Sequence, residues 1–168
     1  LTAMIGSEPR DAGELEAIPA GTKKDPIFDA IELWRNGDEV EAEKLIMKVL
    51  HQDLRAIAAH SCLGNWALDQ EHDVLVEKAL AHFMVGAGIG DQALGDGFDG
   101  CLPWGMLDNR HYLRCLHGQG VALWRLRRPK EAKGVFERVC RLNPSDNTGA
   151  RLCWLAIERG IPWSPEMW

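Results

Sequence analysis

The segment from Gly97 to Gly118, GFDGCLPWGMLDNRHYLRCLHG, gathers the side chains of this chain that are best suited to chemistry. Thiols and imidazoles lie close together in it, among acidic and amide groups: Cys101, His111, Cys115 and His117. Such groups can bind zinc when three or four of them converge, and a Cys paired with a His can act as a nucleophile. The spacing of these residues has to be tested against both chemistries.

Neither chemistry is favoured by the spacing. His111 and Cys115 are four residues apart and share a helical face, but His117 falls on a different face and supplies no third zinc ligand. Cys101 is the best candidate nucleophile, yet the cysteines lie beside apolar neighbours, which do not lower the pKa of a thiol. The glycines of the sequence also match neither the P-loop that binds phosphates nor the G-x-G-x-x-G motif that binds dinucleotides. We therefore expect no metal, no cofactor and no enzymatic activity, and an enzyme that uses Cys101, His111 or His117 is the least favoured alternative.

The acidic residues of the segment fit turn chemistry. Asp108 is placed to cap a helix that opens at Asn109, and Asp99 lies between two glycines, Gly97 and Gly100. The segment belongs largely to an insertion over 87–108, in a region rich in glycine. Its apolar side chains favour a loop packed against the rest of the protein over a disordered one: Phe98, Leu102, Pro103, Trp104 and Met106.

Composition narrows the class of protein. At 168 residues the chain is about one domain, and its net charge of -6 argues against nucleic-acid binding. Its longest apolar runs are far shorter than the roughly 18 residues that a membrane span requires. The five cysteines are scattered and include no C-x-x-C pair, which favours reduced thiols and a cytoplasmic protein.

Helical periodicity organises most of the chain. Residues 1–25 carry prolines, glycines and scattered charge, so we expect a flexible arm there. Asp25-Pro26 is typical of a helix start, and Asp38 with Glu41 fits a capping box. The pattern predicts an all-α domain over 26–160, with helices near 26–36, 38–51, 55–69, 73–86, 109–127, 129–142 and 146–159.

Small residues recur at equivalent places in successive helix pairs. Ala30 and Ala42 stand twelve residues apart in the first pair, as do Gly120 and Ala132 near the end. Gly64 follows Ala30 by 34 residues, a period typical of helical repeats. Because only a small side chain fits where two helices cross closely, we expect these residues at helix crossings.

The last helix pair carries the residues Leu116-x2-Gln119-Gly120-x2-Leu123, Ala132-x3-Phe136 and Pro144. In this spacing they resemble the signature of the tetratricopeptide repeat (TPR) family, with Leu in place of the aromatic residues. The likeness covers about 26–159, although the middle repeat departs from it, because Gly64 and Ala79 are fifteen residues apart. The resemblance implies a right-handed α-α superhelix of three helical hairpins and a closing helix. In such a fold the first helix of each hairpin lines a concave groove.

The resemblance also implies where a partner would bind. The candidate residues on the groove side of these helices are Arg35, Asn65, Arg114, His117, Trp124, Arg125 and Arg151. Arginine can grip a carboxylate bidentately beside an aromatic ring, which favours an acidic or C-terminal peptide. Asn65 matches the Asn of the carboxylate clamp in some TPR domains, but Ala58 and Ser61 stand where basic residues would help. In the alternative interpretation, the tryptophans pack in the core and the arginines are solvated.

The tail over 161–168, IPWSPEMW, is too rich in proline to continue a helix. Trp163 and Trp168 are costly to expose, so we expect them to dock on this molecule or on a second copy, which would form a homodimer. Two function classes stay open: an adaptor that binds a protein or peptide, and a structural or self-associating solenoid whose own tail fills the groove. Neither involves a nucleic acid or a membrane.

Overall fold

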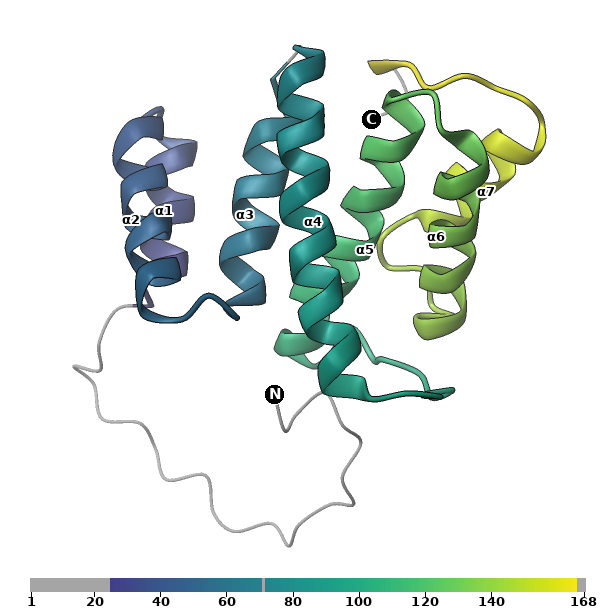
Figure 1. Ribbon diagram of the computed structural model, residues 1–168, viewed down its shortest axis with the longest axis horizontal. Coiled ribbons are helices and arrows are strands. Elements are labelled where there is room, and N and C mark those ends of the chain that lie inside the picture. Colours follow the sequence, from purple (N-terminus) through teal and green to yellow (C-terminus); the bar gives the residue numbers. More distant parts are fainter. Residues whose placement is uncertain (1–24, 71, 166–168) are drawn as a thin grey trace, which may run out of the picture.

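The structure, a computed structural model of the chain, describes residues 25–70 and 72–165. Over these residues it consists of seven helices without a strand, so the predicted all-α class is confirmed (Figure 1). The helices are α1 Pro26–Arg35, α2 Glu39–Gln52, α3 Ile57–Leu68, α4 Asp73–Leu94, α5 Leu107–Arg125, α6 Pro129–Leu142 and α7 Ala150–Glu158. None of these helices is both long and apolar enough to cross a membrane. The arm predicted over 1–25 lies outside the described residues except for Asp25.

The first helix begins where the sequence predicted. The Asp25 carboxylate accepts a hydrogen bond from the backbone N–H of Ile27 at 2.9 Å, and Pro26 occupies the first turn, where its missing N–H costs nothing. Gly37 then turns the chain with a φ of 88°, a conformation that suits glycine. The capping box predicted at the next helix is wrong, because the Asp38 side chain makes no capping hydrogen bond to α2.

Neighbouring helices form hairpins, α1 with α2, α3 with α4 and α5 with α6, and α7 covers α6 (Figure 1). The small residues lie at the predicted crossings. A Cβ atom on Gly64 of α3 would collide with the Phe83 ring of α4, and one on Gly120 of α5 would lie 2.7 Å from the Phe136 ring of α6. The alanines at related crossings are fully buried: Ala30, Ala42, Ala79 and Ala132.

Several helix ends differ from the prediction, and three of these differences change the description of the loops. α4 continues to Leu94, so within the insertion predicted over 87–108 the chain is outside a helix only from 95 to 106. α5 begins before the predicted start, which leaves Asp108 in its first turn without a capping hydrogen bond, although its charge suits the positive end of the helix dipole. α7 begins at Ala150 rather than near 146, because the residues before it form turns with positive φ.

The glycines of α4 explain why that helix is longer than predicted. The prediction took the glycines as a loop because glycine has a low helix propensity. Gly86 and Gly90 instead lie one turn apart on the face that packs against α5, where an added Cβ would meet Cys115 and Tyr112 respectively. The close approach of two helices, and not a break in one of them, accounts for these glycines.

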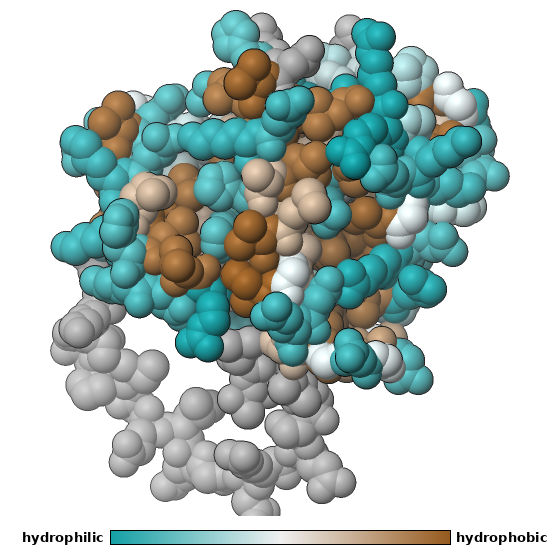
Figure 2. All heavy atoms as spheres, in the orientation of Figure 1, coloured by the Kyte–Doolittle hydropathy of each residue, from teal (hydrophilic) through white to brown (hydrophobic). Residues whose placement is uncertain are grey.

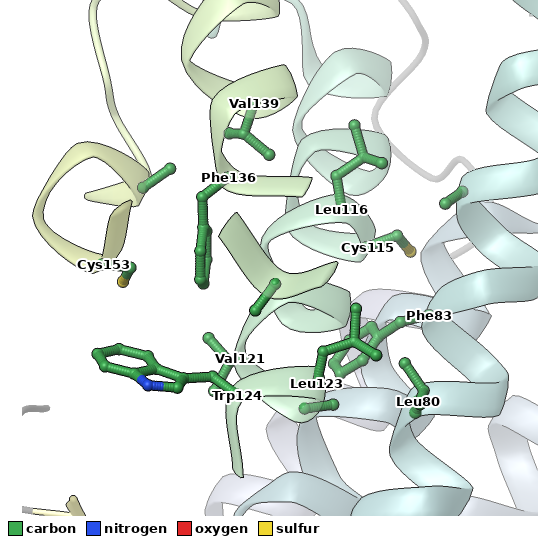
Figure 3. Packing of buried hydrophobic residues seen from close by; sticks show 14 of the residues in the cluster. Leu80, Phe83, Cys115, Leu116, Val121, Leu123, Trp124, Phe136, Val139 and Cys153 are labelled. Carbon is green, nitrogen blue, oxygen red and sulfur yellow. The ribbon is translucent and has the colours of Figure 1, made fainter. Parts of the chain in front are cut away.

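The apolar core has two parts that meet at α3. The larger part extends from α3 to α7 and contains Phe83 and Phe136, which Figure 3 shows among their neighbours, with Phe136 directed between α5 and α7. The smaller part joins α1, α2 and α3 and includes Ile46 and Trp66. α3 therefore links the first hairpin to the rest of the fold.

The loop over 95–106 packs against α5 and α6, as predicted for the insertion. Leu102 is buried, and its backbone N–H donates to the Leu142 carbonyl at 2.6 Å. The Asn143 side chain donates in return to the Leu102 carbonyl at 3.1 Å, and the Asn109 side chain donates to the Pro103 carbonyl at 3.0 Å. These bonds tie the loop to the end of α6 and the start of α5.

Candidate functional site

The C-terminal halves of α3 and α5 and the tail after α7 line an open cavity of about 690 Å³, which we call the groove cavity. Its walls combine apolar, amide and charged side chains: Asn65, Leu68, Asp69, Gln70, His117, Gly118, Val121, Arg125, Trp163 and Pro165. Three of the predicted site residues, Asn65, His117 and Arg125, are therefore brought together. A concave site that mixes an apolar floor with a few polar groups is typical of ligand binding.

Arg125, the last residue of α5, is the most constrained charge in the cavity. Its guanidinium donates to the Leu68 carbonyl at 2.5 Å and to the Gln70 carbonyl at 3.4 Å. The last carbonyls of a helix have no partner within it and carry partial negative charge, so the end of α3 is a natural place for a cation. The same guanidinium lies 4.5 Å from the ring centroid of Trp163 in the tail. Arg125 thus connects α3, α5 and the tail.

A second cavity of about 680 Å³ adjoins the groove cavity at this contact. It is lined by Trp124, Arg125, Arg127, Pro129, Ile157, Gly160, Ile161, Pro162 and Trp163. Arg125 and Trp163 line both cavities, so this pair forms the wall between them.

Burial controls the ionisation of the polar groups in the groove cavity. It lowers the pKa of His117 to about 4, and it raises the pKa of Asp69 above its ordinary value, an effect that Arg125 opposes. At neutral pH His117 is therefore uncharged, and the opposite charges of Asp69 and Arg125 leave the cavity near electrical balance. Net charge in this cavity does not select for an acidic ligand.

His117 also contacts a cysteine, which raises the question of a catalytic pair. Its Nε2 atom lies 3.9 Å from the Sγ atom of Cys153, and its ring meets Phe136 edge-on at 5.5 Å between centroids. Burial raises the pKa of Cys153 to about 11. A protonated thiol beside a neutral imidazole is not an activated nucleophile, because the reactive form is the thiolate.

The other predicted site residues lie elsewhere. Trp124 is only 3% exposed and packs edge-on against Phe136, so it belongs to the core, although it lines the second cavity. Arg35 is exposed in the last turn of α1. The exposed Arg114 stacks over Trp104 of the loop, 5.3 Å from its ring centroid, and the exposed Arg151 donates to the Pro144 carbonyl at 3.1 Å. These three arginines line neither cavity.

The structure tests the predicted docking of the tail for one of its two tryptophans. Trp163 is half-buried against the larger core, so its predicted docking on this molecule is confirmed, while Trp168 lies outside the described residues. No sequence pattern indicates that the carbonyls of Leu68 and Gln70 hold Arg125. The proline on each side of the tail's aromatic residue, Pro162 and Pro165, was the available sign that this segment is extended and can lie across other helices.

The thiols and imidazoles of the segment from Gly97 to Gly118 do not converge on one another. Cys101 is exposed, with its Sγ atom 4.0 Å from the Arg141 carbonyl. Cys115 is buried against α3, where its thiol contacts the Ile57 carbonyl and burial raises its pKa to about 12. Within 25–70 and 72–165, no three His, Cys, Asp or Glu side chains are grouped so that they could hold a metal ion.

A second polar cluster joins α4, α5 and α6. The Tyr112 hydroxyl donates to Asp91 at 2.5 Å, and Arg138 donates to both carboxylate oxygens of Asp91 at 2.6 and 3.1 Å and to the Tyr112 oxygen at 2.9 Å. These groups pair with one another, so we interpret the cluster as a structural tie between three helices.

The outer face, on which α2 and α4 lie in front of α1 and α3, carries apolar side chains dispersed among charged ones (Figure 2). Exposed examples on α2 and α4 are Val40, Met47, Met84 and Val85. Single exposed apolar residues are common on protein surfaces, so this face is a weaker candidate than the groove cavity.

Comparisons with family models, with curated proteins and with solved structures find no match for this chain. The interpretation of the site therefore rests on its own geometry.

Proposed function

We propose that this chain is a non-enzymatic, TPR-like helical repeat module that binds an extended peptide or protein segment in the groove between α3, α5 and the tail. The hairpin arrangement and the glycine–aromatic crossings, Gly64 with Phe83 and Gly120 with Phe136, support a right-handed superhelix of this kind. The five cysteines, all free thiols, suit a reducing compartment such as the cytoplasm.

The groove cavity is the observation that carries the proposal. Asn65 is exposed on its rim, and an amide of this kind can both donate to and accept from a peptide backbone. Val121, Gly118 and Leu68 supply apolar surface beside it. An extended segment laid across this surface would bury apolar side chains while Asn65 satisfies its backbone.

Preference for an acidic or C-terminal segment would have to come from outside the cavity. Arg35, Arg114 and Arg151 are exposed and carry charge that an approaching acidic peptide would meet. Such charges act chiefly on the rate of encounter, so binding through them weakens as salt is added. Reversal of Arg114 and Arg151 to Glu tests this part of the proposal separately from the cavity.

A display library of random peptides, selected on the chain, tests the cavity itself. We expect the selected peptides to lose binding to Asn65→Arg, which places a bulky side chain at the rim, and to keep binding to the matched variant Lys44→Ala on the outer α2. Selected peptides that bind Asn65→Arg as well as the unaltered chain would show that the groove is not the binding surface.

One observation favours the second function class. Trp163 and Pro165 of the chain's own tail already line the groove cavity, as expected of a structural solenoid that fills its own groove. In that case the tail acts as a structural cap, so its removal after Gly160 lowers the free energy of unfolding and creates no peptide binding. In the adaptor, the same removal increases peptide affinity.

A further inference from the structure

The tail reaches the groove through a defined turn. After α7 ends, Gly160 adopts a φ of 71°, and the backbone N–H of Ile161 donates to the Ala156 carbonyl at 3.0 Å. The chain then runs back across the fold towards the end of α5 (Figure 1). Trp163 is placed on Arg125, and Pro165 enters the wall of the groove cavity.

The contact made by Trp163 has the form of a recognition site. The carbonyls at the end of α3 hold the Arg125 guanidinium in place, so a flat cation is presented before any ring docks on it. An aromatic ring gains a cation–π interaction there, and a ligand gains more from a pre-ordered group than from a mobile one. The flanking prolines, Pro162 and Pro165, restrict the tail before it docks, as proline does in many linear recognition motifs.

The docked tail also leaves one polar group unsatisfied. The Nε1 atom of Trp163 is buried and has no hydrogen-bond partner within the part of the chain that the structure describes. A buried N–H without a partner lowers the stability of the docked state, because the group has lost its water. The tail is therefore held less tightly than its ring contact would allow, and a competing segment that buries no such unpaired donor has an advantage over it.

Displacement of the tail would enlarge the site. The Trp163 ring and Arg125 separate the groove cavity from the second cavity, each of close to 700 Å³. With the ring removed, the two cavities would join into one channel that accepts a segment longer than the tail itself. The tail thus occupies the centre of the surface that a longer ligand would use.

We propose that the groove recognises an uncharged, extended segment with an aromatic residue between prolines, and that Pro-Trp-Ser-Pro, residues 162–165, is a built-in ligand that competes with the partner. This inference rests on the proposed function, because it names the ligand of the same groove. The near balance of charge between Asp69 and Arg125 fits an uncharged ligand. A tethered ligand competes strongly, because its effective concentration is in the millimolar range.

The test uses the full chain, its Trp163→Ala variant and a labelled peptide with the sequence IPWSP, blocked at both ends. Fluorescence anisotropy should show at least tenfold tighter binding to Trp163→Ala than to the unaltered chain. The same peptide with Ala for Trp should not bind, and the matched variant Leu152→Ala on the exposed side of α7 should behave as the unaltered chain does. Equal affinity of Trp163→Ala and the unaltered chain, or equal binding of the Trp and Ala peptides, would overturn the proposal.

A second measurement does not depend on the folding of Trp163→Ala. In the unaltered chain, the NMR signal of the Trp163 indole N–H should move towards its solvent-exposed position as the peptide is added in excess, while the signal of Trp66 stays in place. A Trp163 signal that does not move at saturating peptide contradicts competition. A dimer that forms with the unaltered chain and is lost in Trp163→Ala also contradicts it, because the tail would then act between two copies.

The ligand inference and the proposed function are excluded by different outcomes. If Trp163→Ala selects library peptides that Asn65→Arg excludes, but none of them has an aromatic residue next to proline, the ligand inference is wrong and the proposed function stands. If Asn65→Arg excludes no selected peptide, the groove is not a binding surface and both are wrong.

Discussion

The indole rings of Trp34 in α1 and Trp66 in α3 stack face to face, with centroids 4.4 Å apart and planes within 3° of each other. This contact belongs to the smaller part of the core, through which the first hairpin is attached to the rest of the protein. Such a pair contributes both buried area and ring–ring attraction. The attachment of the first hairpin therefore depends strongly on these two side chains.

Trp34→Ala should weaken this attachment. We expect the free energy of unfolding to fall by about 2 kcal/mol, since Trp34 is partly rather than fully buried. Native-state hydrogen exchange should then show faster exchange in α1 and α2 than in α5 and α6. Phe28→Ala is a suitable control, because Phe28 is 56% exposed and its replacement should change the free energy of unfolding little. Uniformly faster exchange in all helices would contradict a separate role for the first hairpin.

The helix crossings predict opposite effects for glycines that look alike in the sequence. Gly120→Leu should lower the free energy of unfolding by about 3 kcal/mol or more, because even a Cβ at this position would lie 2.7 Å from the Phe136 ring. Among the residues that the structure describes, no atom lies within reach of a Cβ added to Gly134, in the middle of α6, so Gly134→Ala should raise that free energy by about 0.5–1 kcal/mol. Urea denaturation of the two variants measures both changes in the free energy of unfolding. A Gly120→Leu variant as stable as the unaltered chain would show that the crossing is misplaced.

Alkaline pH should reveal the tie around Tyr112. Burial first, and then the hydrogen bond to Asp91, raise the pKa of Tyr112 well above its ordinary value. The unfolded chain therefore releases this proton more easily, so the contribution of Tyr112 to stability is complete below pH of about 10 and is lost as the pH rises further. Tyr112 is the only tyrosine in the sequence, so tyrosinate absorbance reports it alone. We expect this absorbance to appear together with the loss of helical circular dichroism, and its appearance in the folded protein near pH 10 would refute the assignment.

Acid should weaken the fold through buried histidines. Burial lowers the pKa of His117 to about 4, and burial, His60 and Lys78 together lower that of His82. The unfolded chain binds these protons more tightly, so stability is complete above pH of about 6.5 and is lost as the pH falls towards 4. For His117 the full loss in the free energy of unfolding is about 3 kcal/mol.

Urea midpoints at pH 7.5 and pH 5 measure this loss. His117→Gln should show a smaller difference between the two midpoints than the unaltered chain. His51→Gln, at an exposed position on α2, serves as the matched control and should leave the difference unchanged. An undiminished difference in His117→Gln would exclude His117 as a source of the acid sensitivity.

The sequence predicts the helix crossings better than the helix ends. Gly64 and Gly120 recur in register with other small residues, so a repeating pattern distinguishes them from glycines in loops. Gly86 and Gly90 have no such register, and the same residue type is equally compatible with a loop and with a close helix contact. Only the position of Tyr112 and Cys115 on the neighbouring helix decides between the two.

Prediction of the groove meets a similar limit. Trp124 and Arg125 are adjacent, yet one enters the core and the other lines the groove cavity, and this depends on a rotation of α5 that the periodicity does not fix. Arg114 lies over Trp104 because of the path taken by the loop, which the sequence does not give. Asn65, His117 and Arg125 were found because each lies beside the packing face of its helix, on the side that the TPR resemblance places in the groove.

The Phe83 ring lies between the two helices that line the groove cavity. An added Cβ on Gly64 of α3 or on Gly118 of α5 would strike the same side chain, Phe83 of α4. Phe83 is therefore a spacer between the two helices that line the groove cavity, and its thickness determines how far apart they stand. A change in the size of this residue would alter the width of the channel, and with it the size of ligand that the protein accepts, from a position that no ligand touches.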